Sequence, residues 1–421
     1  MILKIELILA GKNLLKASLR FILKISTRAI EVFPSLGILR PLLSSSKSLV
    51  FKKKEQSITL PCPYDLQKFQ SNQSSNLKII EVTSFSETEG ARGIGNYLTR
   101  LFSDVNGTSL GGVVFISFTN HNVTFIPPKF LDQKSVYYID TNCANCLELI
   151  QLLSKSTKRI IFTSYFHDNI NPKWCSVLLD SIPDSAVIVY DLIPKYDLLN
   201  FSSISRMRSY FAKYNLLSRS QIFSISASTK LEIENQNLKV TDVIKYKLVK
   251  LETSTVQKDK SILVFGSMNP RKNILRTVIA WDMIQKDFPN HKLTLVGHYS
   301  KTAKFLILSM TRLGHNSISF PGEISDVELN KLFQRSSLLV APSTFEGLGL
   351  PLIRAIELGI PMICSDIHSF REFVSNEKSF FNPFSIGEIS RALRFALLSP
   401  DEYITEIESV EIGAVKFSQI I

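Results

Sequence analysis

Short runs of apolar residues alternate along most of the chain with longer segments in which apolar residues recur at helical spacing. The short runs are rich in Val, Ile and Phe, a composition typical of buried strands. Strands that alternate with helices form βαβ units, so the pattern predicts parallel sheets covered by helices. Strands are expected at 77–82, 112–118, 136–139, 159–163, 186–190 and 221–225 in the first half, and at 261–265, 292–296, 317–320, 337–340 and 361–364 in the second.

The two series of predicted strands imply two doubly wound α/β domains of comparable size. We expect the first domain at residues 77–251 and the second at 261–400, with a polar linker at 252–260 between them. A second polar linker is expected at 57–76, and a helical tail at 401–421. A chain of 421 residues exceeds the usual size of one hydrophobic core, and a cleft between two such domains is a common ligand site.

Charge separates a short basic leader, residues 1–56, from the rest of the chain. The net charge is +12, and residues 1–54 contain eleven Lys or Arg but only two acidic residues. The remainder of the chain is therefore nearly neutral. A protein with this distribution is not expected to bind nucleic acid, because such proteins carry their basic residues across a whole binding domain.

The leader also has the pattern of an amphipathic helix. Basic residues at 12, 16, 20, 24 and 28 share one helical face, opposite Leu and Ile residues. Such a helix within residues 1–33 favours an anionic membrane surface as a partner. Two other interpretations stay open: a helix that packs its apolar stripe on the body of the protein, and an organelle transit peptide.

Cysteine usage and the lack of long apolar runs indicate an unexported protein. The five cysteines are an odd number and do not suggest a disulfide framework. No run reaches the roughly 18 apolar residues of a membrane-spanning helix. We therefore expect a cytoplasmic protein, peripheral on a membrane if the leader binds one. Cys143 and Cys146 form one CxxC pair, but without a second pair we favour ordinary buried cysteines over a metal or redox site.

A glycine-containing loop in the second half carries the strongest chemical pattern. A buried strand is expected to end at Val340, and the loop continues as Glu346-Gly-Leu-Gly-Leu-Pro351 into a helix. Gly347 and Gly349 would let the backbone approach a ligand, and the amides of the loop and of the helix start would bind phosphate. Glu346 would stand at the mouth of that site. The alternative is an ordinary turn between a strand and a helix.

This loop resembles the donor-site signature of the retaining GT-B glycosyltransferases of glycosyltransferase family four, normally E-G-F/L-G-L-P-x-x-E-A. Other segments that resemble the family follow in the expected order. They are the glycine turn at 93–97, the D-L-I-P segment at 189–194, the G-x-x-x-P-R-K-N loop at 265–273, the base-side loop at 320–326, and residues 365–372 and 381–383. The resemblance covers roughly residues 77–400 and is densest after residue 261.

The resemblance implies a GT-B fold, in which two Rossmann-like domains face a cleft and a sugar passes from a nucleotide-sugar donor to a glycan or lipid-linked glycan. It implies retention of the anomeric configuration, with no metal and no other cofactor. Glu346 and Asp191 are the catalytic residues that it implies, with Glu346 orienting the donor sugar. Lys272 and the loop amides would stabilise the leaving diphosphate. The implied donor-binding residues are Gly93, Gly95, Arg271, Lys272, Gly322, Gly347, Leu348, Gly349, Leu350 and Arg354, with a solvated turn charge as the alternative for Arg271.

Several positions depart from the family pattern. Arg354 stands where the family has a glutamate that accepts hydrogen bonds from the donor ribose, and a guanidinium can only donate. It would face a phosphate or an anionic donor, or mark a lost activity. Glu357, one turn further along, could reach the ribose, although its spacing favours a surface charge. Tyr190 replaces a histidine of the family beside Asp191, and His167 is a weak acceptor-side candidate, with a structural role as its alternative.

These departures leave two other functions open beside glycosyl transfer. The first is a catalytically degenerate GT-B homologue that binds a glycan or a nucleotide. The second is a GT-B sugar-nucleotide epimerase. The identities of the donor and the acceptor depend on the shape of the cleft, which the motifs do not specify.

Overall fold

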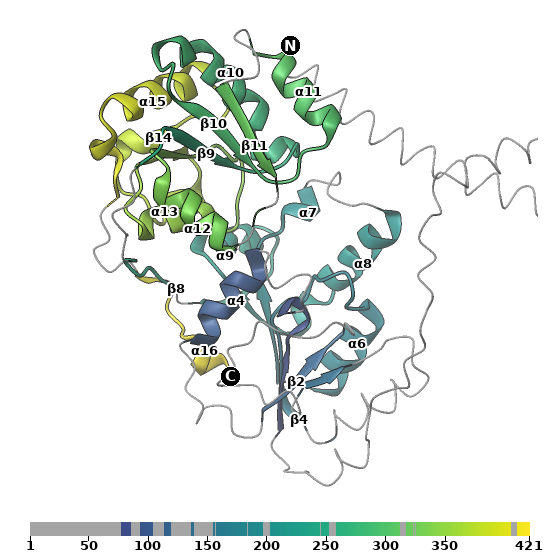
Figure 1. The fold of residues 1–421 in the computed structure, drawn as a ribbon. Helices are drawn as coiled ribbons and strands as arrows, with labels where there is room; N and C mark the ends of the chain where they lie inside the picture. The colour runs from purple at the N-terminus through teal and green to yellow at the C-terminus, as the bar shows by residue number, and fades with distance from the viewer. Residues whose placement is uncertain are drawn as a thin grey trace, which may run out of the picture.

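The computed structural model describes most of the chain beyond residue 76. The described residues are 77–85, 93–103, 113–118, 136–138, 155, 157–182, 184–196, 203–244, 246–251, 258–311, 317–322, 324, 326–405 and 411–421. The expected leader at 1–56, the linker at 57–76 and the Cys143–Cys146 pair lie outside these residues. Figure 1 shows that the described residues form two α/β domains, one above the other in this view.

The first domain contains a seven-stranded parallel sheet. Its strand order is β3-β2-β1-β4-β5-β6-β7, a doubly wound arrangement in which the chain first adds strands on one side of β1 and then on the other. The strands are β1 (Leu77–Glu81), β2 (Val113–Ser117), β3 (Val136–Tyr138), β4 (Thr157–Phe162), β5 (Asp184–Val189), β6 (Gln221–Ser224) and β7 (Val240–Val243). The sequence pattern missed β7, because this short edge strand contains the polar residues Thr241 and Asp242.

The second domain repeats the arrangement with six parallel strands. Their order is β11-β10-β9-β12-β13-β14, so the direction of winding reverses between β9 and β12. The strands are β9 (Ser261–Phe265), β10 (Lys292–Val296), β11 (Ile318–Gly322), β12 (Leu338–Ala341), β13 (Met362–Ser365) and β14 (Phe380–Phe381). The strands expected in the two domains are present, and their ends differ from the expected ones by no more than two residues.

Helices connect successive strands and pack on the sheets. In the first domain they are α4 (Gly93–Ser103), α6 (Pro172–Ser181), α7 (Ile193–Tyr196), α8 (Ile204–Tyr214) and α9 (Ala227–Glu234). In the second domain they are α10 (Ile274–Ile284), α11 (Lys301–Ser309), α12 (Asp326–Arg335), α13 (Leu350–Glu357), α14 (His368–Arg371) and α15 (Ile386–Leu398). Polar residues cap several of them; for example, the side chain of Ser226 accepts a hydrogen bond from the amide of Thr229 at the start of α9.

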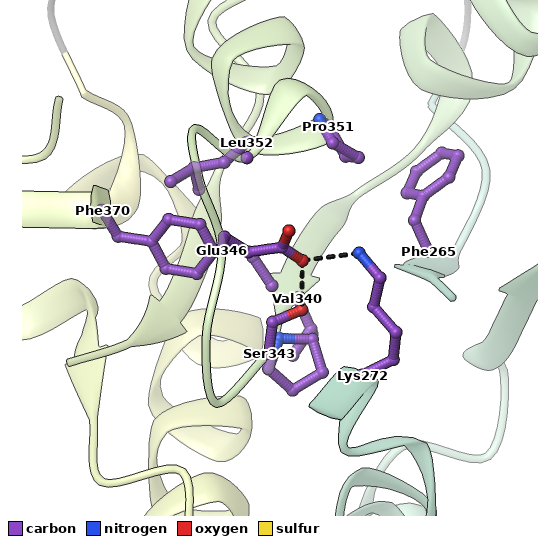
Figure 2. Close-up of a pocket in the computed structure, with 11 residues that line it drawn as sticks. Phe265, Lys272, Val340, Ser343, Glu346, Pro351, Leu352 and Phe370 are labelled. Carbon is purple, nitrogen blue, oxygen red and sulfur yellow. Dashed lines mark hydrogen bonds and ion pairs between the residues drawn. The ribbon is translucent and has the colours of Figure 1, made fainter. Parts of the chain in front are cut away.

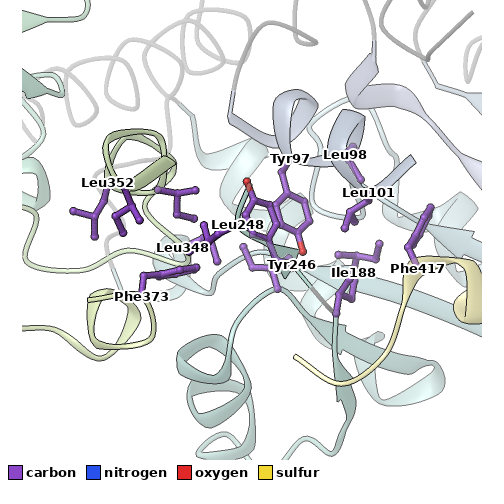
Figure 3. Close-up of a cluster of buried hydrophobic side chains, with 14 of the residues drawn as sticks. Tyr97, Leu98, Leu101, Ile188, Tyr246, Leu248, Leu348, Leu352, Phe373 and Phe417 are labelled. Carbon is purple, nitrogen blue, oxygen red and sulfur yellow. The ribbon is translucent and has the colours of Figure 1, made fainter. Parts of the chain in front are cut away.

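The two domains share an apolar core in addition to their own. In Figure 3, Tyr97, Leu98 and Leu101 of α4 lie in one cluster with Leu348 and Leu352 of the second domain. Tyr246 and Leu248, from the segment that joins the domains, belong to the same cluster. Burial of apolar surface on both sides stabilises one arrangement of the two domains.

The C-terminal tail, expected to be helical, is not a continuous helix. It contains the two-residue strand β15 (Glu411–Ile412) and one helical turn, α16 (Phe417–Ile420). β15 pairs antiparallel with β8 (Tyr246–Lys247), and the ring centroid of Phe417 lies 4.9 Å from that of Phe102. The expectation was wrong because the tail crosses back to the first domain and there pairs with a strand. Within the residues that the structure describes, no helix has the length and apolar character needed to span a bilayer.

Candidate active site

Glu346, in the loop between β12 and α13, lies at the centre of a charged cluster. Its Oε1 lies 2.5 Å from Nζ of Lys272 and accepts a hydrogen bond of 2.7 Å from Oγ of Ser343, while its Oε2 lies 2.9 Å from Nη1 of Arg271. Burial raises the pKa of Glu346, but the charges of Lys272 and Arg271 outweigh burial and hold the pKa below its usual value. The carboxylate is therefore ionised at neutral pH, between two cations.

The two cations are placed by a 3-10 turn that follows β9, residues Pro270–Lys272. The side chain of Asn269 accepts a hydrogen bond from the amide of Arg271, and buried Asn273 closes the turn in the left-handed conformation, with φ of 55°. Nδ2 of Asn273 donates to the carbonyls of Pro342 (3.0 Å) and Pro383 (2.7 Å). This one amide group thereby connects the loops that follow β9, β12 and β14.

Arg271 also fixes the loop that carries Glu346. Its Nη1 donates to the carbonyl of Phe345 at 2.8 Å, and its own carbonyl accepts from the amide of Thr344 at 2.8 Å. The alternative interpretation of Arg271 as a solvated turn charge is therefore wrong. The sequence could not show that this cation would bind the neighbouring loop, and its contact with a phosphate stays a prediction.

The two glycines of the loop are required by contacts within the protein. A Cβ at Gly347 would lie 2.2 Å from the carbonyl oxygen of Tyr190 in the first domain. Gly349 has φ of +86°, and a Cβ there would lie 2.4 Å from the ring of Phe370. We expected both glycines to make room for a ligand. That role stays a prediction; the structure shows in addition that Gly347 allows the two domains to approach and that Gly349 allows α13 to begin beside Phe370.

Asp191 of the first domain lies beside this loop. It follows β5, and its Oδ1 accepts a hydrogen bond of 2.9 Å from the amide of Ile193 at the start of α7. Burial raises the pKa of Asp191; the hydrogen bond and the charge of Arg271 oppose this, and the charge of Glu346 adds to it. Asp191 and Glu346, 155 positions apart in the sequence, thus act on each other across the boundary.

Helix α9 of the first domain binds the second domain through its N-terminus. Oγ of Ser226 donates to the carbonyl of Gly347 at 2.7 Å. The amides of Ala227 and Ser228 donate to the carboxylate of Glu372 at 2.9 and 2.6 Å, an arrangement in which the helix dipole favours the negative charge. Sequence reasoning assigned no role to Ser226 or Glu372, although Ser226 has the spacing of a helix cap.

A pocket lies between Lys272 and the start of α13. It contains about 290 Å³ of space, including solvent at its mouth. Figure 2 shows Lys272 and Glu346 pointing toward each other, with Phe265 on one side and Phe370 on the other. The lining residues are Phe265, Lys272, Val340, Ala341, Pro342, Ser343, Glu346, Gly349, Pro351, Leu352 and Phe370. The pocket lies at the carboxyl ends of β9 and β12, where doubly wound sheets bind ligands.

Two charged residues of α13, Arg354 and Glu357, have partners that the sequence did not indicate. Arg354 donates from Nη2 to Oδ1 of Asn330 on α12 at 2.6 Å and is not among the residues that line the pocket. Glu357 is fully buried and forms a two-pronged ion pair with Arg100, so the surface-charge interpretation was wrong. The pattern could not reveal this, because the partner of Glu357 belongs to the other domain.

The remaining predicted residues are spread along the boundary. Leu348 is buried in the shared core, Leu350 begins α13, and Gly322 ends β11 with φ of +83° and open space beside its Cα. Gly93 and Gly95 lie in the first turn of α4, whose leading amides have no partner within the helix.

The two acceptor-side positions have structural contacts. Nδ1 of His167 accepts a hydrogen bond from the amide of Asn169 at 3.2 Å, and its carbonyl accepts from Nζ of buried Lys213 at 2.7 Å. The hydroxyl of Tyr190 donates to the carbonyl of Thr163 at 2.7 Å, and its ring packs edge-on against Tyr97.

Comparison with known proteins finds a family model that matches part of the second half of the chain. The sequence model of the family described as Glycosyl transferases group 1 matches residues 250–408. The serotype-specific mannosyltransferase WbdA of Escherichia coli is 24% identical over 285 residues, covering 61% of this chain and 34% of WbdA. O-antigen chain mannosyltransferase B of Escherichia coli is 27% identical over 130 residues, covering 30% of this chain and 34% of that protein. The chain spans about a third of the length of these curated relatives.

Solved structures extend the likeness to both domains. HepE of Anabaena, solved in complex with UDP and glucose, superimposes with a TM-score of 0.57 at 16% identity, covering 78% of this chain and 91% of that one. Sucrose-phosphate synthase of Thermosynechococcus elongatus gives 0.57 at 15% identity, with the same coverage. The two Rossmann-like domains are those of the GT-B fold. Within this fold, residues 250–408 are similar to the Glycosyl transferases group 1 family.

Proposed function

We propose that the protein transfers a sugar from a nucleotide-sugar donor to a glycan or lipid-linked glycan. The observation that carries the proposal is the cluster of Lys272, Arg271 and Glu346 at the carboxyl ends of β9 and β12. Two cations at that point can bind a diphosphate, and a carboxylate between them can accept hydrogen bonds from sugar hydroxyls. HepE, which has this fold, binds UDP and glucose, and the curated relatives are named mannosyltransferases.

The cluster suggests how the reaction would be accelerated. When the bond between the anomeric carbon and the diphosphate oxygen breaks, the electron pair stays on that oxygen and negative charge gathers on the diphosphate. The 3-10 turn already places the backbone of Lys272 and Arg271 at this point, so their side chains need only turn from Glu346 to the diphosphate to stabilise this charge. We propose that they do so without a metal ion and that the configuration at the anomeric carbon is retained. The described residues contain no group of three or more His, Cys, Asp or Glu side chains suited to hold a metal.

In the structure, Lys272 and Arg271 both pair with the carboxylate of Glu346. A bound donor would place its phosphates on Lys272 and Arg271 and its sugar hydroxyls on Glu346. Glu346 would exchange its two ion pairs for hydrogen bonds from neutral sugar hydroxyls. Lys272 and Arg271 would exchange a carboxylate for the more highly charged diphosphate. We propose that Asp191, which lies in the first domain beside the loop of Glu346, faces the incoming acceptor.

Arg354 and Tyr190 support a second candidate function, a degenerate homologue that binds nucleotide or glycan without turnover. Arg354 cannot accept hydrogen bonds from a ribose, and it already binds Asn330. Substitution Arg354→Glu separates the two functions. Transfer that appears only in this variant would identify the parent as degenerate, whereas activity in the parent would dismiss the second candidate.

The principal test is a panel of GDP-, UDP- and ADP-sugars added to the full chain. A donor at 100 times its Kd stabilises a protein by about 2.7 kcal/mol, which is measurable as a rise in the thermal midpoint. Release of nucleoside diphosphate is followed in the same samples. We expect one donor to stabilise the wild type and Lys286→Ala, an exposed control, but not Lys272→Ala. Neither stabilisation nor release with any donor would contradict the proposed function.

We also propose that the basic leader holds the protein on an anionic membrane surface, where a lipid-linked acceptor would lie. Its eleven basic residues can each contribute up to about 1 kcal/mol near such a surface. Deleting residues 1–56 should release the protein from anionic vesicles and leave donor binding unchanged. Vesicle binding that survives the deletion would refute this location.

A further inference from the structure

A charged pair in the shared core, outside the pocket, joins the two domains. Arg100 lies near the end of α4 in the first domain, and Glu357 is the last residue of α13 in the second. Nη2 of Arg100 donates to Oε2 of Glu357 at 2.6 Å, and Nη1 donates to Oε1. The side chain of Glu357 is 0% exposed. The pair is therefore a parallel, two-bond contact that fixes the orientation of both groups.

The segment that connects the domains meets the same pair. The amide of Val249 donates to Oε1 of Glu357 at 3.3 Å, and the amide of Leu251 donates to its carbonyl at 2.8 Å. Arg100 donates to the hydroxyl of Tyr246 at 2.8 Å and lies 5.5 Å from the centre of its ring. Figure 3 shows Tyr246 beside Tyr97 of α4, with which it stacks at 5.5 Å. Two helices from different domains and their connection thus meet at one carboxylate.

Glu357 is in an unfavourable place for a carboxylate unless a cation accompanies it. Burial removes its hydration, and the C-terminal end of a helix carries partial negative charge. Arg354, one turn earlier, is 3.9 Å away and is hydrogen-bonded to Asn330, which leaves Arg100 as its closest cationic partner. Apolar side chains of the same volume would stabilise such a core about as well, so what the pair adds is a defined geometry.

That geometry reaches the pocket through α13. The helix has eight residues, so at about 1.5 Å per residue its ends lie about 10 Å apart. Its first turn contributes Pro351 and Leu352 to the pocket, directly after the loop that carries Glu346. A helix this short moves as a rigid unit, and a displacement at Glu357 therefore moves the pocket wall.

We propose that Arg100 is a positioning residue for the nucleotide-sugar site, supplied by the domain that does not contain that site. By holding Glu357, it sets the position of α13 and hence of Glu346 relative to Lys272. The inference rests on the proposed function, since it assigns Arg100 to the donor site of that reaction. The inference adds a requirement that the donor-site motifs do not contain. The donor site is complete only when the first domain is docked on the second.

The experiment compares variants of the full chain. Arg100→Met removes the charge, and Arg100→Lys keeps the charge but loses the two-bond geometry. Arg159→Met is the control, because Arg159 also pairs with a carboxylate, with its Nη1 donating to both oxygens of Asp184 on the neighbouring strand of the first-domain sheet. Turnover of the donor is measured together with hydrogen exchange of the amides in 346–353. Thermal unfolding verifies that each variant is folded.

We expect Arg100→Met to lower kcat by about 10- to 100-fold, since a displacement near 1 Å has effects of this size. Arg100→Lys should fall between it and the wild type, and Arg159→Met should stay within about twofold. Exchange in 346–353 should become faster in Arg100→Met only. A folded Arg100→Met with wild-type turnover and wild-type exchange would overturn the inference.

The inference is still tested if Arg100→Met does not fold or if the wild type has no activity. If Arg100→Met does not fold, Arg100→Lys decides: wild-type kcat and exchange would overturn the inference, and reduced kcat with faster exchange would support it. If the wild type turns over no donor, the proposed function fails. The exchange comparison then still decides whether Arg100 holds α13 and the loop of Glu346 in place.

Discussion

Glu346 lies in the loop before helix α13, and Glu357 is the last residue of that helix. Both carboxylates pair with an arginine, but their surroundings differ. Glu346 is 13% exposed, lines the pocket, and takes both of its cations from its own domain. Glu357 is 0% exposed, lies in the shared core, and takes Arg100 from the other domain. One carboxylate can exchange its partners for a ligand, and the other cannot be reached by one.

The difference separates two effects of a buried ion pair. At Glu346, desolvation of Lys272, which lines the pocket, and of Arg271 beside it makes them strong anion binders once Glu346 is satisfied by hydroxyl groups. In the core, desolvation of Glu357 makes the loss of Arg100 costly, so the pair favours the docked arrangement over all others. Variants at the two glutamates should therefore separate activity from stability.

The largest effect on stability is expected for Glu357→Ala. It leaves the guanidinium of Arg100 without its carboxylate at the domain boundary. Removal of one partner of a buried pair costs about 3 to 5 kcal/mol, and we expect the lower end of this range because the side chain of Arg100 is 34% exposed. The free energy of unfolding, measured with urea, reports the loss. The double variant Arg100→Gln/Glu357→Gln should recover much of it, because no unpaired charge remains.

The control for this prediction is an ion pair at the surface. Glu377 is 75% exposed and pairs with Arg371, so Glu377→Ala should change the unfolding free energy by no more than about 1 kcal/mol. If Glu357→Ala costs no more than Glu377→Ala, the pair with Arg100 does not stabilise the docked domains, and the comparison between the two glutamates fails.

The second effect concerns activity and is expected for Glu346→Gln. The amide keeps the size of the carboxylate but no longer neutralises Lys272 and Arg271, so a nucleoside diphosphate should bind about tenfold more tightly. Turnover of the sugar nucleotide should fall about 100-fold, because the sugar hydroxyls lose their anionic acceptor. Isothermal titration and a turnover assay measure the two quantities.

Opposite changes in affinity and turnover are what distinguish this prediction from simple damage to the pocket. Diphosphate affinity that falls together with turnover would show that Glu346 supports the cations and does not compete for them. The lowered pKa of Glu346 also predicts a pH dependence. The ion pairs with Lys272 and Arg271 contribute their full stabilisation above the usual pKa of a glutamate, and this stabilisation is lost as the pH falls through the lower pKa of the folded protein.

The sequence was sufficient to predict the alternation of strands and helices, because buried parallel strands are continuous apolar runs. It also put Glu346, Lys272 and Asp191 in loops that follow such strands, and carboxyl ends of parallel strands meet at one edge; their roles in the reaction stay predictions. The short strands β7, β8, β14 and β15 were missed. Two to four residues carry too little pattern, and their pairing depends on distant segments.

The sequence could not show the contacts that cross the domain boundary. Glu357 was interpreted as a surface charge because its partner Arg100 is 257 positions away. Gly347 was interpreted as making room for a ligand because Tyr190, whose carbonyl it faces, belongs to the other domain. A helical spacing or a glycine indicates that a position is constrained, but the identity of the constraining group requires the fold.

A pair of glycine variants tests the boundary without changing charge. Gly347→Ala places a Cβ 2.2 Å from the carbonyl of Tyr190, and neither backbone can yield without moving a domain. We expect a loss of about 1 to 3 kcal/mol in unfolding free energy, with weaker donor binding. Gly387→Ala is the control, since a Cβ there meets no atom within 4 Å and alanine favours its helix, α15. Equal stability of the two variants would mean that the domains separate readily at Gly347.

The smallest effect concerns a third carboxylate, Glu232 of α9, for which the described residues provide no ion pair like those of the other two. Its Oε2 accepts a hydrogen bond of 3.4 Å from the amide of Leu192. Burial raises its pKa from 4.5 to about 7; the charge of Asp191 adds to this, while the Leu192 hydrogen bond and the charge of Lys195 oppose it. Between these two pH values the folded protein holds a proton that the unfolded chain has released. The carboxyl therefore contributes most to stability below pH 4.5, and that contribution is lost as the pH rises through about 7.

Glu232→Gln is neutral at every pH and should escape this loss. Relative to the wild type, the variant should gain about 1 kcal/mol of unfolding free energy between pH 5 and pH 8, a value reduced for the partial exposure of the side chain. Glu234→Gln, on the same helix, removes a surface pair with Lys230 at 3.9 Å and should show no such change. Urea unfolding at the two pH values measures both variants. A difference between Glu232→Gln and the wild type that does not grow with pH would show that α9 relaxes to hydrate Glu232.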